Sequence, residues 1–475
     1  MVLKQTLPIG KFFTSILAQI LKILSKSMAK VVNEDYVVDP IKQDSEPFMT
    51  MRERKTYNKW RLRILSFIII GYGAYYLCRQ NFSMIMPAYM EEFGYSKTQL
   101  GWVLTLASIV YGIGKFVNGY FSDKSNARYF MPIGLFASAL ITFLLGFSNS
   151  LIFLGCLWII NNWFQSMGWP PAARMLTHWF APRELGTKWA LGAASHQVGG
   201  AITLVFSGYL VSNYGWRYAF FIPSIIAVGI SYILFNRLRE SPKELGFPLV
   251  EAYKGDESFE EDRSEDHMTT IEIFRKVFIN RNMWYISFAN ICIYIVRIGI
   301  IFWGPLFLKE HKGISLTHAG WQVAGYEVAG LLGGFAAGWL SDKVFKGQRG
   351  PVGAVCMICL AITLIIFWQM PSGYDRFGAI ALSLVGFFVY GPQVLVGVAS
   401  ADFASKKAIG TANGFVGTMG YVGSALSGVC VGWLIDETGW FGAFSFFIVA
   451  ALLGSYLFFL TWNRKENEVN SVTIE

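Results

Sequence analysis

Five ionisable side chains interrupt apolar stretches that are otherwise long enough to cross a lipid bilayer. They are Arg79, Lys115, His196, Arg297 and Glu327. A charge near the centre of a membrane span costs on the order of 2.5–3.5 kcal/mol even on a lenient insertion scale, so each needs a physical reason. Only Glu327 is available as an internal counter-charge. We therefore expect an anionic ligand to neutralise the remaining positive charges at mid-depth.

The chemistry of two arginines points to a tetrahedral oxyanion. A guanidinium binds such an anion through two parallel hydrogen bonds and keeps its charge when desolvated, which a lysine need not do. Phosphate carries about 1.5–2 negative charges near neutral pH and is a common metabolite group that suits two such forks. A carboxylate or a sulfate also fits electrostatically. The alternative is that Arg79 and Arg297 are structural and bind backbone carbonyls within a helix bundle.

Other polar residues in the spans are weaker candidates for the same site. His196 is either a phosphate donor or a packing residue, and Lys115 either binds substrate or pairs with Glu327 or a backbone carbonyl. Asn162, like its neighbours Asn161 and Gln165, either bonds between helices or faces the cavity. Tyrosines can stack on a sugar ring and donate to its hydroxyls, and the candidates are Tyr72, Tyr75, Tyr76, Tyr111, Tyr294 and Tyr390. Tyr76 and Tyr294 are the better ones, since each lies about one turn before an arginine.

The composition identifies the kind of protein that must position these residues. The 475 residues are 54% hydrophobic, 16% aromatic and only 15% charged, with a mean hydropathy of +0.42. Soluble domains carry roughly 25% charged residues. This deficit excludes a disordered or nucleic-acid-binding chain and predicts an all-α, multi-pass membrane protein. The formal charge of +9 is explained by basic residues in short loops on one side of the membrane.

Twelve apolar stretches of about 20 residues fall into two sets of six that repeat each other. Gly119-Tyr-Phe-Ser-Asp-Lys124 recurs as Gly338-Trp-Leu-Ser-Asp-Lys343, and Tyr76-x-x-Arg79 recurs as Tyr294-x-x-Arg297. Gly208-Tyr-Leu-Val likewise recurs as Gly432-Trp-Leu-Ile. Repeats of the same sense predict two halves related by an axis along the membrane normal, with the substrate between them near the midplane. The symmetry would place Arg79 and Arg297 on opposite sides of one cavity.

The predicted domain organisation follows from these spans. It comprises a cytoplasmic N-terminal segment with an amphipathic helix (1–60), a first six-helix half (61–236), a cytoplasmic linker (237–282), a second six-helix half (283–462) and a cytoplasmic tail (463–475). The amphipathic helix is expected where apolar residues recur from Phe12 to Leu24; a signal peptide is the alternative. Lysine and arginine in the short loops place both termini in the cytoplasm. The six cysteines lie in apolar stretches and indicate no disulfide framework.

The duplicated turns are candidates for a gate. Asp123 with Lys124, and Asp342 with Lys343, can cap the next helix or pair with basic residues of the same half, which would hold the cytoplasmic gate in one state. The alternative is a tight turn that carries positive-inside residues. No metal or cofactor is implied, and no nucleotide-binding loop is present.

These motifs resemble those of the major facilitator superfamily, and specifically of the organophosphate:phosphate antiporters. The resemblance covers about residues 57–462. The segments that carry it are Gly71-Tyr-Gly-Ala-Tyr-Tyr-Leu-Cys-Arg-Gln-Asn-Phe82, Tyr111-Gly-Ile-Gly-Lys115, Ser122-Asp-Lys-Ser-Asn-Ala-Arg-Tyr-Phe130, Phe164-Gln-Ser-Met-Gly-Trp-Pro-Pro171, His196-x-Val-Gly-Gly200, Tyr294-x-x-Arg297 and Tyr390-Gly-Pro-Gln393. The resemblance implies a phosphate-binding pair at Arg79 and Arg297, with Lys115 and His196 shaping the site. It also implies exchange of a sugar phosphate for inorganic phosphate by alternating access.

The sequence departs from the family pattern at two positions. The family commonly has a lysine after the first arginine and an aspartate five residues beyond the second, where this chain has Gln80 and Phe302. Three functions remain open beside exchange of a hexose 6-phosphate such as glucose 6-phosphate. They are glycerol 3-phosphate exchange, a hexose-phosphate sensor that signals through a membrane partner with little flux, and a membrane phosphatase. No catalytic motif supports the phosphatase, so we expect a bacterial inner-membrane transporter and not an enzyme.

Overall fold

The described part of the computed structural model is entirely helical apart from its turns and loops. It comprises residues 49–250, 253, 275, 277–404 and 408–462. The first half contains α2 (Met51–Leu77), α3 (Asn81–Phe93), α4 (Lys97–Lys124), α5 (Ala127–Leu145), α6 (Leu151–Gln165), α7 (Trp169–Trp179), α8 (Pro182–Tyr214) and α9 (Tyr218–Arg237), followed by the short η1 (Pro242–Leu245). The second half contains α12 (Arg281–Glu310), α13 (Leu316–Lys343), α14 (Arg349–Gln369), α15 (Asp375–Asp402), α16 (Ile409–Thr438) and α17 (Trp440–Phe459). The predicted amphipathic helix lies outside the described residues.

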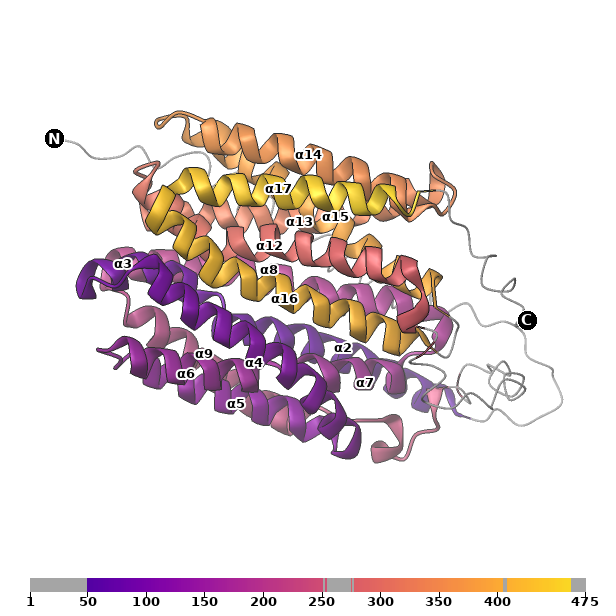
Figure 1. The fold of residues 1–475 in the computed structure, drawn as a ribbon. Coiled ribbons are helices and arrows are strands. Elements are labelled where there is room, and N and C mark those ends of the chain that lie inside the picture. Colours follow the sequence, from indigo (N-terminus) through magenta and orange to yellow (C-terminus); the bar gives the residue numbers. More distant parts are fainter. Residues whose placement is uncertain (1–48, 251–252, 254–274, 276, 405–407, 463–475) are drawn as a thin grey trace.

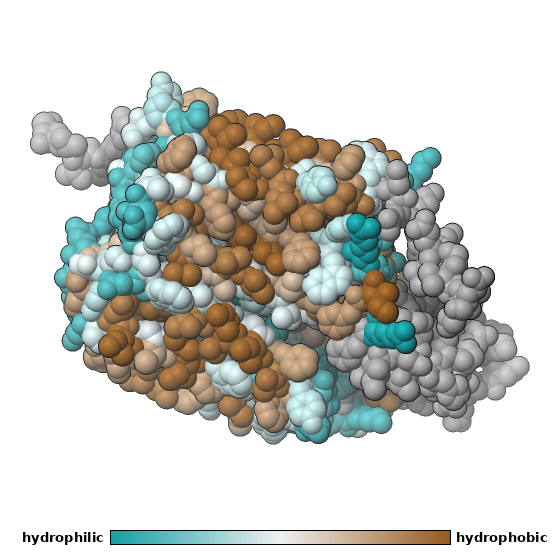
Figure 2. All heavy atoms as spheres, viewed as in Figure 1, coloured by the Kyte–Doolittle hydropathy of each residue, from teal (hydrophilic) through white to brown (hydrophobic). Residues whose placement is uncertain are grey.

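The helices run along one common direction, as a membrane protein requires (Figure 1). Within the described residues, 10 segments are long and apolar enough to cross a membrane, and α2 with α3 counts as one of them. The stretch α6–α7 and the long α8 occupy the positions of the fourth and fifth predicted spans. Apolar side chains cover the middle of the face seen in Figure 2, while hydrophilic ones gather toward its two ends. The predicted all-α membrane fold is confirmed.

The two halves pack against each other through α4 with α16 and α8 with α13, so α4 and α16 lie side by side in Figure 1. Small residues allow this approach. A Cβ on Gly101 would lie 2.7 Å from the carbonyl oxygen of Gly428, and one on Gly320 would lie 2.5 Å from that of Leu204. In membranes such glycines replace bulkier side chains where backbones approach closely. The halves are thus held together by backbone proximity along two helix pairs.

The molecule has two ends, which we name by their features. The turn face carries the ends of α4 and α13, where the two Ser-Asp-Lys segments form the last helical residues and not a loop, and the opposite face carries the α3–α4 and α12–α13 connections. Ion pairs join the halves on the opposite face: Lys309 Nζ lies 2.5 Å from Glu91 Oε2, and Lys97 Nζ lies 3.3 Å from Glu310 Oε2. The Asp436 carboxylate also accepts hydrogen bonds from Thr98 N and Oγ1, at 2.7 and 2.6 Å. Ion pairs and hydrogen bonds therefore connect the two halves at this face.

Candidate functional site

A cavity of about 300 Å³ lies between the halves, with walls from both. Nine of the predicted site residues line it: Tyr72, Tyr76, Arg79, Tyr111, Lys115, Asn162, His196, Tyr294 and Arg297. Tyr390 and Glu327 are almost wholly buried and stand behind Arg297 in the wall of the second half. The arrangement that the repeats predict, with one arginine from each half at a shared cavity, is present in the structure.

Arg79 lies in a break between two helices. The stretch 78–80 between α2 and α3 is a turn, and the N–H groups of Cys78 and Arg79 bond three residues back, at 3.2 and 3.1 Å. Two side chains of α6 bond carbonyls near this break, one in the last turn of α2 and one in the break itself. Asn161 Nδ2 donates to Cys78 O at 2.8 Å, and Gln165 Nε2 donates to Tyr75 O at 3.0 Å. Unpaired buried carbonyls are costly, so these two amides make the break tolerable.

The guanidinium of Arg79 is surrounded by aromatic rings. Its Cζ lies 4.0 Å from the centroid of the Tyr111 ring and 5.8 Å from that of Tyr76. Within the described chain no carboxylate comes within 4.0 Å of it. Aromatic faces stabilise a cation by about 0.5–2 kcal/mol without neutralising it. The charge of Arg79 is therefore available to a ligand in the cavity.

Arg297, in contrast to Arg79, lies inside an unbroken helix, α12, with 7% of its surface exposed. Its Cζ lies 4.6 Å from the Tyr390 ring centroid and 5.6 Å from that of Tyr294. The buried Nε of this guanidinium has no hydrogen-bond partner in the described structure. No ion pair reaches Arg297 within that same part of the chain, so a second unneutralised cation lines the cavity.

His196 connects the halves at this level. Its Nδ1 contacts the carbonyl of Ala193 one turn earlier, and its Nε2 lies 3.4 Å from Nη2 of Arg297. A carbonyl requires Nδ1 to carry the proton, so Nε2 of the neutral ring accepts from Arg297. In this arrangement His196 orients the guanidinium. A direct hydrogen bond from His196 to a phosphate would require a second proton on the ring.

Glu327 is a buried acceptor with two neutral donors. Its carboxylate accepts from Gln80 Nε2 of the first half at 2.9 Å and from the hydroxyl of Tyr390. It forms no ion pair with a lysine or arginine among the described residues, and its role as counter-charge remains a prediction. The side chain of Gln80 fits because residue 200 is glycine, where a Cβ would lie 2.2 Å from Gln80 Oε1. Gln80 thus makes a polar link between the halves beside the arginines.

The remaining candidates have more modest contacts. Lys115 Nζ lies 5.5 Å from the Tyr421 ring centroid and has no ion-pair partner in the described chain. Asn162 lines the cavity but donates to Trp158 O of its own helix at 2.9 Å. Tyr75 serves the packing, since its hydroxyl donates to Met131 O at 2.7 Å. Sequence reasoning did not select Tyr421 or Gln393, both of which line the cavity; the only signal for Gln393 was its place in the Tyr390-Gly-Pro-Gln393 motif.

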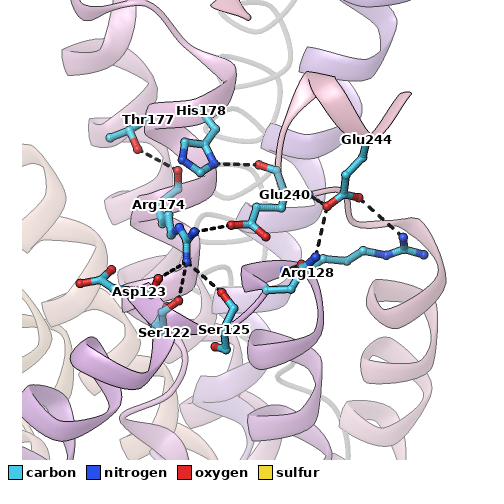
Figure 3. Close-up of polar contacts among 10 residues, drawn as sticks. Ser122, Asp123, Ser125, Arg128, Arg174, Thr177, His178, Glu240 and Glu244 are labelled. Carbon is cyan, nitrogen blue, oxygen red and sulfur yellow. Dashed lines mark hydrogen bonds and ion pairs between the residues drawn. The ribbon is translucent and has the colours of Figure 1, made fainter. Parts of the chain in front are cut away.

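The duplicated turns differ in their contacts. At the C-terminal end of α4, Arg174 of α7 donates through Nη1 to the carbonyls of Ser122, Asp123 and Ser125 at 2.6–2.9 Å, and its Nη2 lies 2.7 Å from Glu240 (Figure 3). This cluster therefore uses the backbone of Asp123.

At the C-terminal end of α13, the carboxylate of Asp342 pairs with Arg349, whose Nε lies 3.1 Å from Asp402. Lys124 Nζ lies 4.4 Å from the Tyr120 ring centroid, and Lys343 is exposed. In both halves the contacts stay within one half, and the gating roles remain predictions.

Several known membrane transport proteins are similar to this chain. The model of the Major Facilitator Superfamily matches residues 68–391 and 286–474. A probable hexose phosphate transport protein of Chlamydia pneumoniae is 39% identical over 88% of this chain and 94% of its own length. A glycerol-3-phosphate transporter of Bacillus subtilis is 40% identical over 86% of this chain and 93% of its own. The membrane sensor protein UhpC of Escherichia coli is 37% identical over 84% and 92%, respectively.

Solved structures support the fold at lower identity. The crystal structure of a bacterial homolog of the human lysosomal transporter Spinster superimposes with a TM-score of 0.70 at 16% identity, and covers 85% of this chain and 97% of the other. Together with the paired arginines and the matched family model, these likenesses identify a multi-pass membrane protein. The chain belongs to the Major Facilitator Superfamily and, within it, to the organophosphate:phosphate antiporter family.

Proposed function

We propose that this protein exchanges a sugar phosphate, namely a hexose 6-phosphate such as glucose 6-phosphate, for inorganic phosphate across a bacterial inner membrane. The observation that carries the proposal is the pair of guanidiniums, Arg79 and Arg297, which line one cavity from opposite halves without a carboxylate at ion-pair distance among the described residues. A phosphate dianion supplies the missing charge and can accept from both forks. The relatives named as hexose phosphate and glycerol-3-phosphate transporters support the same substrate class.

The geometry suggests how binding is coupled to movement. In the empty cavity two positive charges on different halves resist further approach. A bound dianion bridges them, and this attraction lowers the barrier to closing and reorienting the halves around the site. Reorientation without an anion is slow, which makes the transport an exchange. Inorganic phosphate and the sugar phosphate compete for the one site because both present the same charged group.

The ion pairs between the halves on the opposite face indicate which side of the cavity is closed. With basic residues concentrated in the loops of the turn face, we place that face and both termini in the cytoplasm. The ion pairs Glu91–Lys309 and Lys97–Glu310 then close the periplasmic side. The cavity would receive its ligand from the cytoplasm in this state, and the outer contacts would have to break before it opens to the periplasm.

Proteoliposomes loaded with inorganic phosphate test the proposal. Labelled phosphate outside should accumulate by counterflow, and glucose 6-phosphate should compete more strongly than glycerol 3-phosphate. Stronger competition by glycerol 3-phosphate would assign the chain to that substrate instead. Absence of counterflow together with tight binding of hexose phosphate would favour the sensor function, for which the likeness to UhpC is the supporting observation.

Release of phosphate from the sugar phosphate by purified protein would favour the phosphatase alternative. Membership of a transporter family weighs against that outcome.

A further inference from the structure

The cavity is graded in polarity along the membrane normal. The level of the arginines contains Tyr76, Tyr111 and Tyr390 on three different helices. One turn toward the turn face, each helix presents another polar side chain: Tyr72 precedes Tyr76 by four residues, Lys115 follows Tyr111 by four, and Gln393 follows Tyr390 by three. Such spacings keep a common helix face and shift the side chain by about 4.5–6 Å along the helix axis. All three line the cavity, and we call them the upper ring.

The wall on the other side of the arginines is mostly apolar. It is formed by Leu104, Ile301 and Phe302, and by Phe82 stacked on Trp158 with ring centroids 4.3 Å apart. Burying a hydroxyl there without a partner would cost about 1–3 kcal/mol. The hydroxylated part of a substrate is thus disfavoured on this side of the guanidiniums.

The serine hydroxyls on that apolar side are already used by the protein. Ser108 Oγ lies 2.9 Å from Ser424 Oγ, and Ser83 Oγ donates to Gln80 O at 3.0 Å. In contrast, the buried Oε1 of Gln393 has no hydrogen-bond partner in the described structure. An amide oxygen needs a donor, and the hydroxyls of a sugar phosphate can supply one beyond the level of the arginines, whereas the hydroxyl of inorganic phosphate stays on the group that the arginines hold. The unused acceptors on the cavity wall are therefore Gln393 Oε1 in the upper ring and Gln80 Oε1 beside the arginines.

We propose that the upper ring of Tyr72, Lys115 and Gln393 binds the hydroxyl groups of the transported organophosphate, and that Gln393 selects organophosphate over inorganic phosphate. This inference rests on the proposed function, because it assumes that the phosphoryl group lies between Arg79 and Arg297. The amide of Gln393 then accepts from one hydroxyl and can donate to a second. Inorganic phosphate occupies only the level of the arginines and makes no use of this amide.

Calorimetric titration of the purified full-length protein with glucose 6-phosphate and with inorganic phosphate tests the upper ring. Gln393→Leu keeps the side-chain size and removes the amide. It should weaken glucose 6-phosphate binding about tenfold, as expected for one or two hydrogen bonds in a desolvated site, and leave phosphate affinity within about twofold. Tyr72→Phe, which removes a single hydroxyl, should weaken glucose 6-phosphate binding about threefold with the same selectivity.

Gln322→Leu is the matched control. Gln322 is a buried glutamine of the same half that also has an unpartnered Oε1, but it lies on α13 away from the cavity and donates to Asp375 O at 3.4 Å. It should change neither affinity. A parallel loss of both ligands in Gln393→Leu and Tyr72→Phe, or no loss in either variant, would overturn the upper ring while the wild-type protein still binds both anions. Failure of the wild-type protein to bind either anion would overturn the proposed function itself.

Discussion

The two arginines are equivalent in the sequence repeat and unequal in the structure. Arg79 occupies a break between α2 and α3 whose carbonyls are held by Asn161 and Gln165. Arg297 lies within the continuous α12, backed by Tyr390 and oriented by His196 of the other half. A broken helix bends more readily than a continuous one, because fewer backbone bonds oppose the motion. The comparison suggests that the first half adapts to the ligand while the second half presents a fixed charge.

The largest expected effect tests whether both charges are needed despite this difference. Arg79→Lys and Arg297→Lys should each reduce phosphate counterflow by on the order of 100-fold or more, because a lysine cannot form the two-pronged bond to the anion. Both variants should still insert in the membrane and purify normally. Full exchange by the Arg297→Lys variant would show that the second half does not use its guanidinium in the way proposed.

A second prediction concerns the polar link between the halves. Gly200→Ala places a methyl group 2.2 Å from Gln80 Oε1, which must displace the amide from Glu327. We expect the maximal exchange rate to change about tenfold with little change in phosphate affinity, because the substitution removes a bond between buried groups of the two halves. The control is Gly229→Ala, where no heavy atom lies within 4 Å of the new methyl group. An unchanged rate in Gly200→Ala would mean that the Gln80–Glu327 bond is incidental.

The broken helix itself can be tested with a matched pair of asparagines. Asn161→Leu leaves the Cys78 carbonyl unpaired at the break, and Asn290→Leu removes a similar buried bond to Val416 O at 2.8 Å in the second half. Each should cost about 1–3 kcal/mol of stability, measured as a lower unfolding midpoint. Only Asn161→Leu should also weaken phosphate binding, by about fivefold. Equal phosphate affinities in the two variants would contradict a special role for the break.

The smallest effects are expected at the duplicated turns. Arg174→Gln removes the donor to three backbone carbonyls and should slow exchange severalfold. Asp123→Asn should stay within about twofold of wild type, because the backbone of Asp123 and not its carboxylate makes the contact. Asp342→Asn, which does remove a carboxylate contact with Arg349, should fall between the two. A stronger effect of Asp123→Asn than of Arg174→Gln would favour the gating role predicted for the aspartate.

The sequence alone determined the membrane class, the all-helical fold and the pairing of Arg79 with Arg297. Hydropathy, the repeat of Tyr-x-x-Arg and the cost of a charge in lipid are properties of local sequence, so they can be recognised without coordinates. Tyr76 and Tyr294 were found beside their arginines for the same reason, since residues one helical turn apart share a face. The domain boundaries near residues 60, 237 and 283 remain predictions.

Only the tertiary structure decided which neighbours each charge has. Glu327 bonds to Gln80, 247 positions away, and His196 meets Arg297 from another helix in the other half. The break at Arg79 depends on two amides of α6 that no local pattern connects to it. Hydropathy records how often apolar residues occur along a helix, but the rotation of that helix about its axis and its distance from its neighbours are set by packing. Packing therefore determined which residues contact the charged side chains, whereas the sequence only placed those side chains near the middle of the membrane.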